Sequence, residues 1–144
     1  MPQLPRTSTW HLPQPDVETQ KYWDAAADGK LMIKHCRRCG RNIFYPRDHC
    51  PVCWATDTEW IEASGRGTVY TFTIVRQNDL PPFNERVPYV VAIIELDEGV
   101  RMTSNIEGCA PEDVSCGMRV EVSFRPEQRS DEESVSLPVF RPAD

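Results

Sequence analysis

Two Cys-x-x-Cys pairs, Cys36 with Cys39 and Cys50 with Cys53, constrain this 144-residue chain more than any other feature. Each pair can form a tight turn that directs two sulfurs at one metal ion, and the pairs together offer the four thiolates of a closed zinc site. The ten residues between the pairs leave room for a short hairpin. Gly40 follows the first pair, where such a turn often needs a residue with positive φ. The spacing therefore predicts one structural Zn²⁺ ion bound by all four cysteines.

Other uses of the four cysteines stay open from the sequence: two disulfides, free thiols in a core, or iron in a rubredoxin-like site. Residues 1–15 contain four prolines and no apolar run, so they do not resemble a secretory signal. We therefore expect a cytoplasmic protein in a reducing compartment, where such spacing favours a metal over disulfides. A site closed by four thiolates has no open position for a substrate, so its metal would stabilise the fold without doing chemistry. The neighbouring His35 and His49 are not expected to be ligands.

The net charge of −6 is distributed unevenly along the chain. Residues 30–60 carry six lysines and arginines against three acidic residues, whereas residues 61–125 carry six against ten. An acidic chain is a poor general binder of nucleic acid, because neutralising phosphates supplies most of that affinity. The basic segment is either an ordinary solvated surface or a small site for an anionic group such as a nucleotide phosphate. No apolar stretch is long enough to span a membrane.

The N-terminal part predicts a flexible arm over residues 1–15 and then a short helix. Asp16 is the expected N-cap of this helix, and Tyr22, Trp23 and Ala26 form its apolar face. A strand is expected to lead into the first cysteine pair. Trp54 and Trp60 follow the second pair, where we expect them to cover the metal-binding sulfurs.

After residue 63 the chain changes to short runs rich in β-branched and aromatic residues, which predict strands. Alternation along the first run places Tyr70, Phe72 and Ile74 on one face. The expected strands span residues 68–75, 89–96, 100–104, 119–125 and 134–140. Five short strands without a long helix between them predict a Greek-key barrel of the OB type. The fold class is thus mainly β, with an N-terminal helix and zinc ribbon at 16–62 and a five-stranded OB barrel with a C-terminal tail at 63–144.

No nucleophile, base and orienting group stand out together, and all three histidines precede the predicted barrel. The Gly65-x-Gly67 sequence is a weak phosphate-binding signal, because it lacks a third glycine and precedes a strand instead of a helix. A bend at the entry to the barrel is its expected role. Cys109 and Cys116 lie outside the paired motifs and are expected to be ordinary buried or turn residues.

The order of these parts resembles one known family. A helix with Tyr22-Trp23, the cysteine ribbon with the sequence 44–47 before its second pair, and the strands at 65–73 and 88–96 occur in the same succession. Over about residues 17–125 the chain is similar to the acyl-CoA-associated OB-fold proteins with a rubredoxin-like zinc ribbon, the domain-of-unknown-function family thirty-five. The resemblance implies an accessory subunit that works beside a thiolase or a steroid side-chain retro-aldolase, in some cases with a hotdog-fold enoyl-CoA hydratase. It also implies that the barrel helps to hold the CoA thioester while the partner supplies catalysis.

Three functions therefore compete. The leading hypothesis is a non-catalytic acyl-CoA-binding accessory subunit of a thiolase-like enzyme in acyl-CoA or lipid metabolism. The alternatives are a single-strand nucleic-acid binder, which would need a basic groove with exposed stacking aromatics, and a scaffold that only stabilises a partner. Arg47 in the basic ribbon and Arg66 between two glycines are the candidates for contacting CoA phosphates, although each could be a solvated surface charge. Trp10, Phe44 and Trp54 are candidate anchors for the partner.

Overall fold

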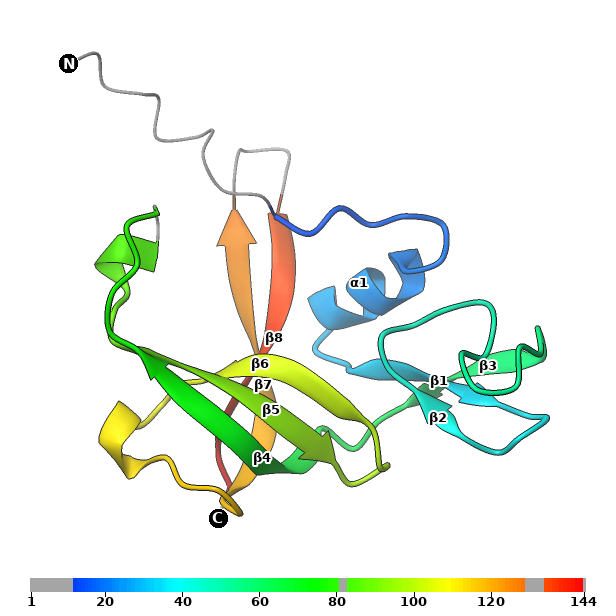
Figure 1. Ribbon diagram of the computed structural model, residues 1–144. Helices are drawn as coiled ribbons and strands as arrows, with labels where there is room; N and C mark the ends of the chain where they lie inside the picture. The colour runs from blue at the N-terminus through cyan, green and yellow to red at the C-terminus, as the bar shows by residue number, and fades with distance from the viewer. Residues whose placement is uncertain (1–11, 81–82, 129–133, 144) are drawn as a thin grey trace.

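The computed structural model describes residues 12–80, 83–128 and 134–143, and it combines a three-stranded sheet with a closed five-stranded barrel (Figure 1). The candidate anchor Trp10 lies outside these residues. The elements are α1 (Gln20–Ala27), β1 (Met32–Cys36), β2 (Asn42–Ile43), β3 (Thr58–Glu62), β4 (Arg66–Val75), η1 (Phe83–Glu85), β5 (Tyr89–Leu96), β6 (Arg101–Ile106), η2 (Pro111–Asp113), β7 (Arg119–Gln128) and β8 (Ser134–Pro142). The predicted fold class is confirmed: a mainly β chain with a helix, a ribbon and a five-stranded barrel.

Helix α1 begins at Gln20, later than the expected start directly after Asp16. The Asp16 carboxylate instead accepts hydrogen bonds from the backbone N–H of Thr19 at 2.9 Å and from its hydroxyl at 2.8 Å. These bonds, the one from the hydroxyl first, lower the pKa of Asp16 and hold a turn ahead of the helix. The predicted apolar face is confirmed, because Tyr22 and Ala26 are buried.

An aromatic cluster connects α1 to the ribbon. The Tyr22 ring lies 4.8 Å from Trp23, 5.9 Å from Phe44 and 5.5 Å from Tyr45, in edge-on arrangements that favour aromatic pairs. The indole N–H of Trp23 donates a hydrogen bond of 3.1 Å to the Tyr45 hydroxyl. Phe44 therefore supports the fold from within, which leaves it a poor candidate for an exposed anchor.

The three ribbon strands form a small antiparallel sheet in the order β2-β1-β3. Strand β1 pairs with β2 through Lys34 and Ile43 and with β3 along its whole length. The Asn42 side chain donates to the Glu98 carbonyl at 2.9 Å, which links the ribbon to the β5–β6 turn of the barrel. The ribbon is thus held beside one end of the barrel.

The barrel closes in the order β4-β5-β6-β8-β7. Pairing of β4 with β7 and a parallel contact between Ile106 of β6 and Phe140 of β8 complete the ring. Gly67 lies where the chain enters this ring. A Cβ atom there would be 2.6 Å from the Glu95 carbonyl oxygen, so a side chain would force β4 and β5 apart. This close approach agrees with the expected role of the glycine pair as a barrel-entry bend.

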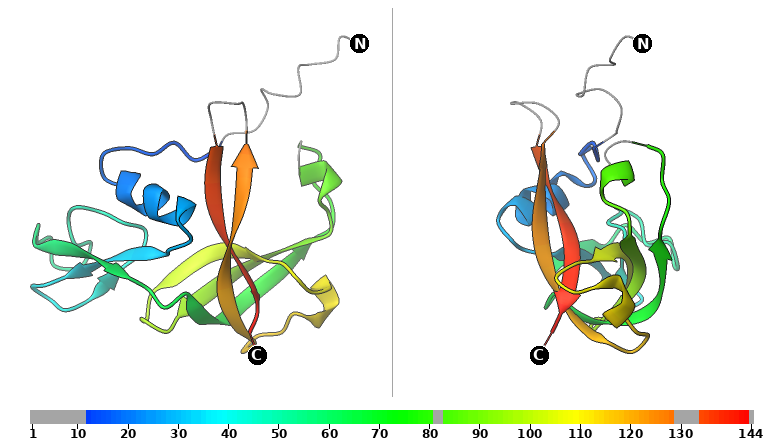
Figure 2. Two further views of the ribbon diagram at one scale, coloured as in Figure 1. Left: turned by 180° about the vertical axis from the view of Figure 1, so that it is seen from behind. Right: turned by 90° about the vertical axis from the view of Figure 1, so that its left-hand side faces the viewer.

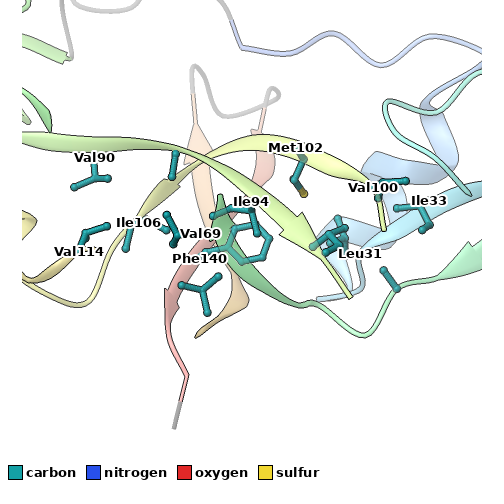
Figure 3. Close-up of a cluster of buried hydrophobic side chains, with 14 of the residues drawn as sticks. Leu31, Ile33, Val69, Val90, Ile94, Val100, Met102, Ile106, Val114 and Phe140 are labelled. Carbon is teal, nitrogen blue, oxygen red and sulfur yellow. The ribbon is translucent and has the colours of Figure 1, made fainter. Parts of the chain in front are cut away.

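One apolar core fills the barrel and continues under the ribbon (Figure 3). Phe140, Ile94 and Val120 belong to this core and are fully buried. Leu31 and Ile33, from the segment that leads into the ribbon, join the same cluster beside Val100 and Met102 (Figure 3). Burial of this shared surface is the main force that fixes the ribbon to the barrel.

The predicted common face for Tyr70, Phe72 and Ile74 is wrong for Tyr70. The pairing register shifts between Val69 and Thr71, so Tyr70 is the extra residue of a β-bulge. Tyr70 is consequently half exposed, and the Arg101 guanidinium lies 3.8 Å from its ring centre. Phe72 and Ile74 pack against the core as expected.

Strands β7 and β8 extend beyond the other barrel strands as a hairpin, and α1 packs against β8 (Figures 1 and 2). Among the described residues, no helix has the length and apolar composition that crossing a membrane requires.

Candidate functional site

The four cysteine sulfurs of the ribbon converge on one point. The Sγ atoms of Cys36 and Cys53 are 3.6 Å apart, as are those of Cys39 and Cys50, and all four lie within 4.8 Å of one another. Tetrahedral coordination with Zn–S bonds of about 2.3 Å separates sulfurs by about 3.8 Å, so this arrangement fits zinc. A disulfide needs about 2.05 Å, so none joins these sulfurs.

Each cysteine pair forms a knuckle, which we define as residues 36–41 and 50–55. The backbone N–H of Gly40 donates to the Cys36 carbonyl at 2.8 Å, and that of Trp54 donates to the Cys50 carbonyl at 2.9 Å. Both donors have positive φ, 77° for Gly40 and 65° for Trp54. The two knuckles thus adopt the same backbone turn, and in each of them one residue has the expected positive φ.

Hydrogen bonds within the knuckles favour thiolates. The backbone N–H of Cys53 lowers the pKa of the Cys50 thiol to about 6, and that of Cys39 lowers the pKa of Cys36. The backbone N–H of Arg41 lowers the pKa of Cys39, but burial and the three neighbouring sulfurs outweigh it and raise that pKa to about 11. Four thiolates so close together need a cation between them, which is the chemistry of a structural metal site.

The other candidate ligands lie elsewhere. The His35 ring is hydrogen-bonded to the Asn42 side chain, with Nδ1 2.7 Å from Oδ1, and His49 is exposed. Cys109 is half-buried and Cys116 exposed, both on the barrel side of the chain. Within the part of the chain that the structure describes, the metal-ligating cluster consists of the four ribbon cysteines alone.

The expectation that Trp54 and Trp60 cover the sulfurs is wrong. Trp54 is 78% exposed and therefore does not cover the sulfurs. Trp60 lies on β3 and packs against the barrel core, with the Lys34 ammonium 4.7 Å from its ring centre. The apolar residues around the sulfurs are instead Ile43 and Ala55.

Arg47 and Arg66 are both exposed and come from different parts of the fold. Arg47 lies in the ribbon between β2 and the second knuckle, whereas Arg66 is the first residue of β4. Arg66 contributes to lowering the pKa of Asp97, although hydrogen bonding from Arg119 is the main cause. Neither arginine lines a described pocket.

The structure adds a pocket that sequence reasoning did not find. It has a volume of about 470 Å³ and opens at the mouth of the barrel, between η1, η2 and the ends of β5 and β6. Its polar residues are paired: Arg86 binds the buried Glu127 at 2.8 Å, and Arg125 forms ion pairs with Glu127 and Glu107. The charges balance within the pocket, and the Nε atom of Arg125 is buried beside Glu127 without a well-aligned hydrogen bond. In the sequence, the charged residues at alternate positions near the end of β7 are the signal that could have indicated this pocket.

The pocket and Arg66 lie at opposite ends of the barrel. Val90 lines the pocket, whereas Leu96 pairs with Gly67 beside Arg66. Six residues of strand separate these points by about 20 Å, at roughly 3.3 Å per residue. One small ligand group therefore cannot contact both.

Comparison with known proteins places this architecture in a family. The model of the ChsH2 rubredoxin-like zinc ribbon domain matches residues 23–59, and that of the ChsH2 C-terminal OB-fold domain matches residues 60–125. A DUF35 domain-containing scaffold protein of Methanocaldococcus jannaschii is 46% identical over 96 residues, which cover 66% of this chain and 67% of that protein. The chain belongs to the DUF35 family of zinc-ribbon and OB-fold proteins.

Several similar proteins are named for enzymes of CoA thioesters. The benzoylsuccinyl-CoA thiolase subunit BbsA of Thauera aromatica is 32% identical over 103 residues, 69% of each chain. A probable enoyl-CoA hydratase alpha subunit of Thermomonospora curvata is 36% identical over 133 residues, 91% of this chain but only 40% of that protein. A solved structure of an Ltp2-ChsH2(DUF35) aldolase superposes with a TM-score of 0.76 at 34% identity, covering 91% of this chain and 98% of the other.

Proposed function

We propose that this chain is a non-catalytic accessory subunit that binds a thiolase-like enzyme, a thiolase or an aldolase, and helps it to act on an acyl-CoA thioester. The observation that carries the proposal is the likeness of 91% of the chain to the DUF35 part of an aldolase complex, at 34% identity. The thiolase subunit and the hydratase alpha subunit among the similar proteins support the same class of partner and ligand. A hotdog-fold hydratase is the second kind of partner that we propose, because a probable enoyl-CoA hydratase alpha subunit is among the similar proteins.

The metal has a structural role in this proposal. Cys36, Cys39, Cys50 and Cys53 would hold a Zn²⁺ ion, and the convergence of their four sulfurs fits it. Four thiolates leave no coordination position for substrate, so the ion would fix the relative positions of the two knuckles. The ribbon could then present a defined surface to the partner.

The acyl-CoA ligand would be bound jointly with the partner. Arg47 and Arg66 stay our candidates for its phosphates because both residues are exposed. The barrel-mouth pocket suits phosphates less well, because Glu107 and Glu127 already neutralise Arg125 and Arg86 there. Phosphate recognition usually relies on arginines that are available for charge-assisted bonds.

Coexpression with a candidate thiolase- or aldolase-type subunit tests the function. We expect a stable complex whose acyl-CoA activity depends on this chain, while the chain alone turns over no acyl-CoA. Arg47→Ala and Arg66→Ala should raise the KM for acyl-CoA in an intact complex. Arg76→Ala is the matched control, because Arg76 is an exposed barrel arginine with a long ion pair of 3.9 Å to Glu112. Full activity of the partner without this chain would contradict the accessory role.

The nucleic-acid alternative has less support. The Tyr70 ring is covered by Arg101, and Phe83 packs near Tyr89 with ring centres 6.2 Å apart, so these aromatic residues are partly engaged within the chain. We expect no shift of a single-stranded oligonucleotide at moderate salt, as the net charge of −6 suggests. Salt-dependent binding tighter than about micromolar would favour the alternative instead.

A further inference from the structure

The two knuckles adopt the same backbone turn but differ in the type of residue that has the positive φ. Gly40 takes this conformation at little cost, whereas Trp54 must adopt it with a bulky side chain. The cost is not offset by burial within the chain, because Trp54 is 78% exposed. A strained residue whose side chain is directed into solvent is a candidate for a role outside the fold.

Other exposed residues with partner-binding character lie on the same two knuckles. Val52, between the cysteines of the second knuckle, is 52% exposed. Arg38 and Arg41 of the first knuckle are exposed and form no ion pair with any residue that the structure describes. Their neighbour Arg37 differs, because it binds Asp57 and Glu59 at 3.1 Å each.

The sulfur cluster holds the exposed residues of the two knuckles near one another. Since all four Sγ atoms lie within 4.8 Å, the two knuckles are fixed side by side. We define the knuckle surface as Arg38, Arg41, Val52 and Trp54. It combines an exposed indole, an aliphatic side chain and two guanidinium groups that have no counter-ion among the described residues.

We propose that the knuckle surface is the docking site for the thiolase-type partner subunit. This inference rests on the proposed function and adds the surface that performs it. The complementary site is an apolar recess that takes the Trp54 indole, with carboxylates at its rim for Arg38 and Arg41. Tryptophan and arginine dominate the binding energy of many interfaces, and rim charges steer association. Because the knuckle surface is positive while the whole chain has a net charge of −6, electrostatic attraction would orient this surface towards the partner as the two proteins associate.

The decisive variant is Trp54→Gly, because it separates binding from folding. Glycine relieves the positive φ, and the first knuckle shows that this turn accepts it, so the thermal midpoint and zinc content should stay the same or rise. The affinity for the coexpressed thiolase-type subunit should fall at least tenfold. Leu80→Ala is the matched control, since Leu80 is 66% exposed on a barrel loop and should leave the affinity unchanged.

Charge reversal tests the contribution of the two arginines of the knuckle surface. Arg38→Glu and Arg41→Glu should slow association with the same subunit several-fold and reduce its salt dependence, while Arg38→Lys should retain most of the rate. A wild-type complex that Trp54→Gly weakens by less than twofold would overturn the docking site but leave the accessory function standing. Absence of any wild-type complex would overturn both. Displacement of the partner by a single-stranded oligonucleotide from this surface would assign the knuckles to nucleic acid and also overturn the proposal.

Discussion

The ribbon and the barrel obtain their stability from different sources. Around the ribbon sulfurs the buried cluster consists of Cys36, Ile43 and Cys50, so little apolar surface supports the knuckles. The barrel core instead contains many buried aliphatic side chains around Phe140. A small module without a sufficient core commonly depends on a metal. One chain can therefore join a ribbon whose structure depends on a metal to a barrel whose structure depends on a buried core. Leu31 and Ile33 connect the two regions, because they belong to the same core cluster as the barrel residues.

Removing the metal should produce the largest effect and should affect the two regions unequally. In Cys39→Ser we expect the knuckles to lose their structure, because binding energy of about 10 kcal/mol or more becomes folding energy in such sites. The barrel should keep its strands. Metal analysis and amide NMR of both regions would measure this.

The control for this variant is Cys116→Ser, because Cys116 is exposed and outside the cluster. It should retain one equivalent of zinc. Protein purified without chelator that holds less than half an equivalent of any metal would contradict the metal site, and iron in place of zinc would correct the identity of the ion.

Truncating the barrel core should give the next largest effect. Phe140 is fully buried and touches the point where β6 and β8 meet, so Phe140→Ala should lower the free energy of unfolding by about 3–5 kcal/mol. Denaturant unfolding would measure the change. Tyr70→Ala is the matched aromatic control, since the half-exposed bulge residue should cost far less. Similar losses of unfolding free energy for both variants would show that the stability of the barrel does not come mainly from its buried core.

The same difference between regions explains what could be predicted from the sequence. The metal cluster follows from local spacing, because each Cys-x-x-Cys turn brings its own two sulfurs together whatever the rest of the chain does. The barrel strands follow from alternation and composition, and the structure has strands at all five expected places, with ends that differ by a few residues. The domain boundary between residues 62 and 63 stays a prediction.

The errors concern features that depend on a neighbouring element. The bulge at Tyr70 arises from the register with β5, and one extra residue is invisible to alternation within β4. Trp60 follows the metal knuckle in sequence, but strand pairing carries it to the barrel core. The pocket joins side chains from distant segments, including Arg86 and Arg125, so no local pattern contains it.

Surface ion pairs should have the smallest effect, and they should not distinguish the ribbon from the barrel. Arg119 binds Asp97 on the barrel at 2.8 Å, as Arg37 binds Asp57 on the ribbon at 3.1 Å, and all four side chains are about half exposed. Exposed pairs contribute about 0–1 kcal/mol, so Asp97→Asn should lower stability by no more than that at neutral pH.

The pH dependence of the Asp97 contribution has a definite sign. Hydrogen bonding from Arg119 lowers the pKa of Asp97 in the folded protein below its ordinary value of 3.8. The stabilisation is therefore complete above that value and is lost as the pH falls through the lower folded pKa, because the unfolded chain takes up the proton first. The stability difference between the wild type and Asp97→Asn should shrink towards zero in acid and also decrease at high salt. A difference that grows below pH 4, or one well above 1 kcal/mol at neutral pH, would show that this barrel pair is not an ordinary surface contact.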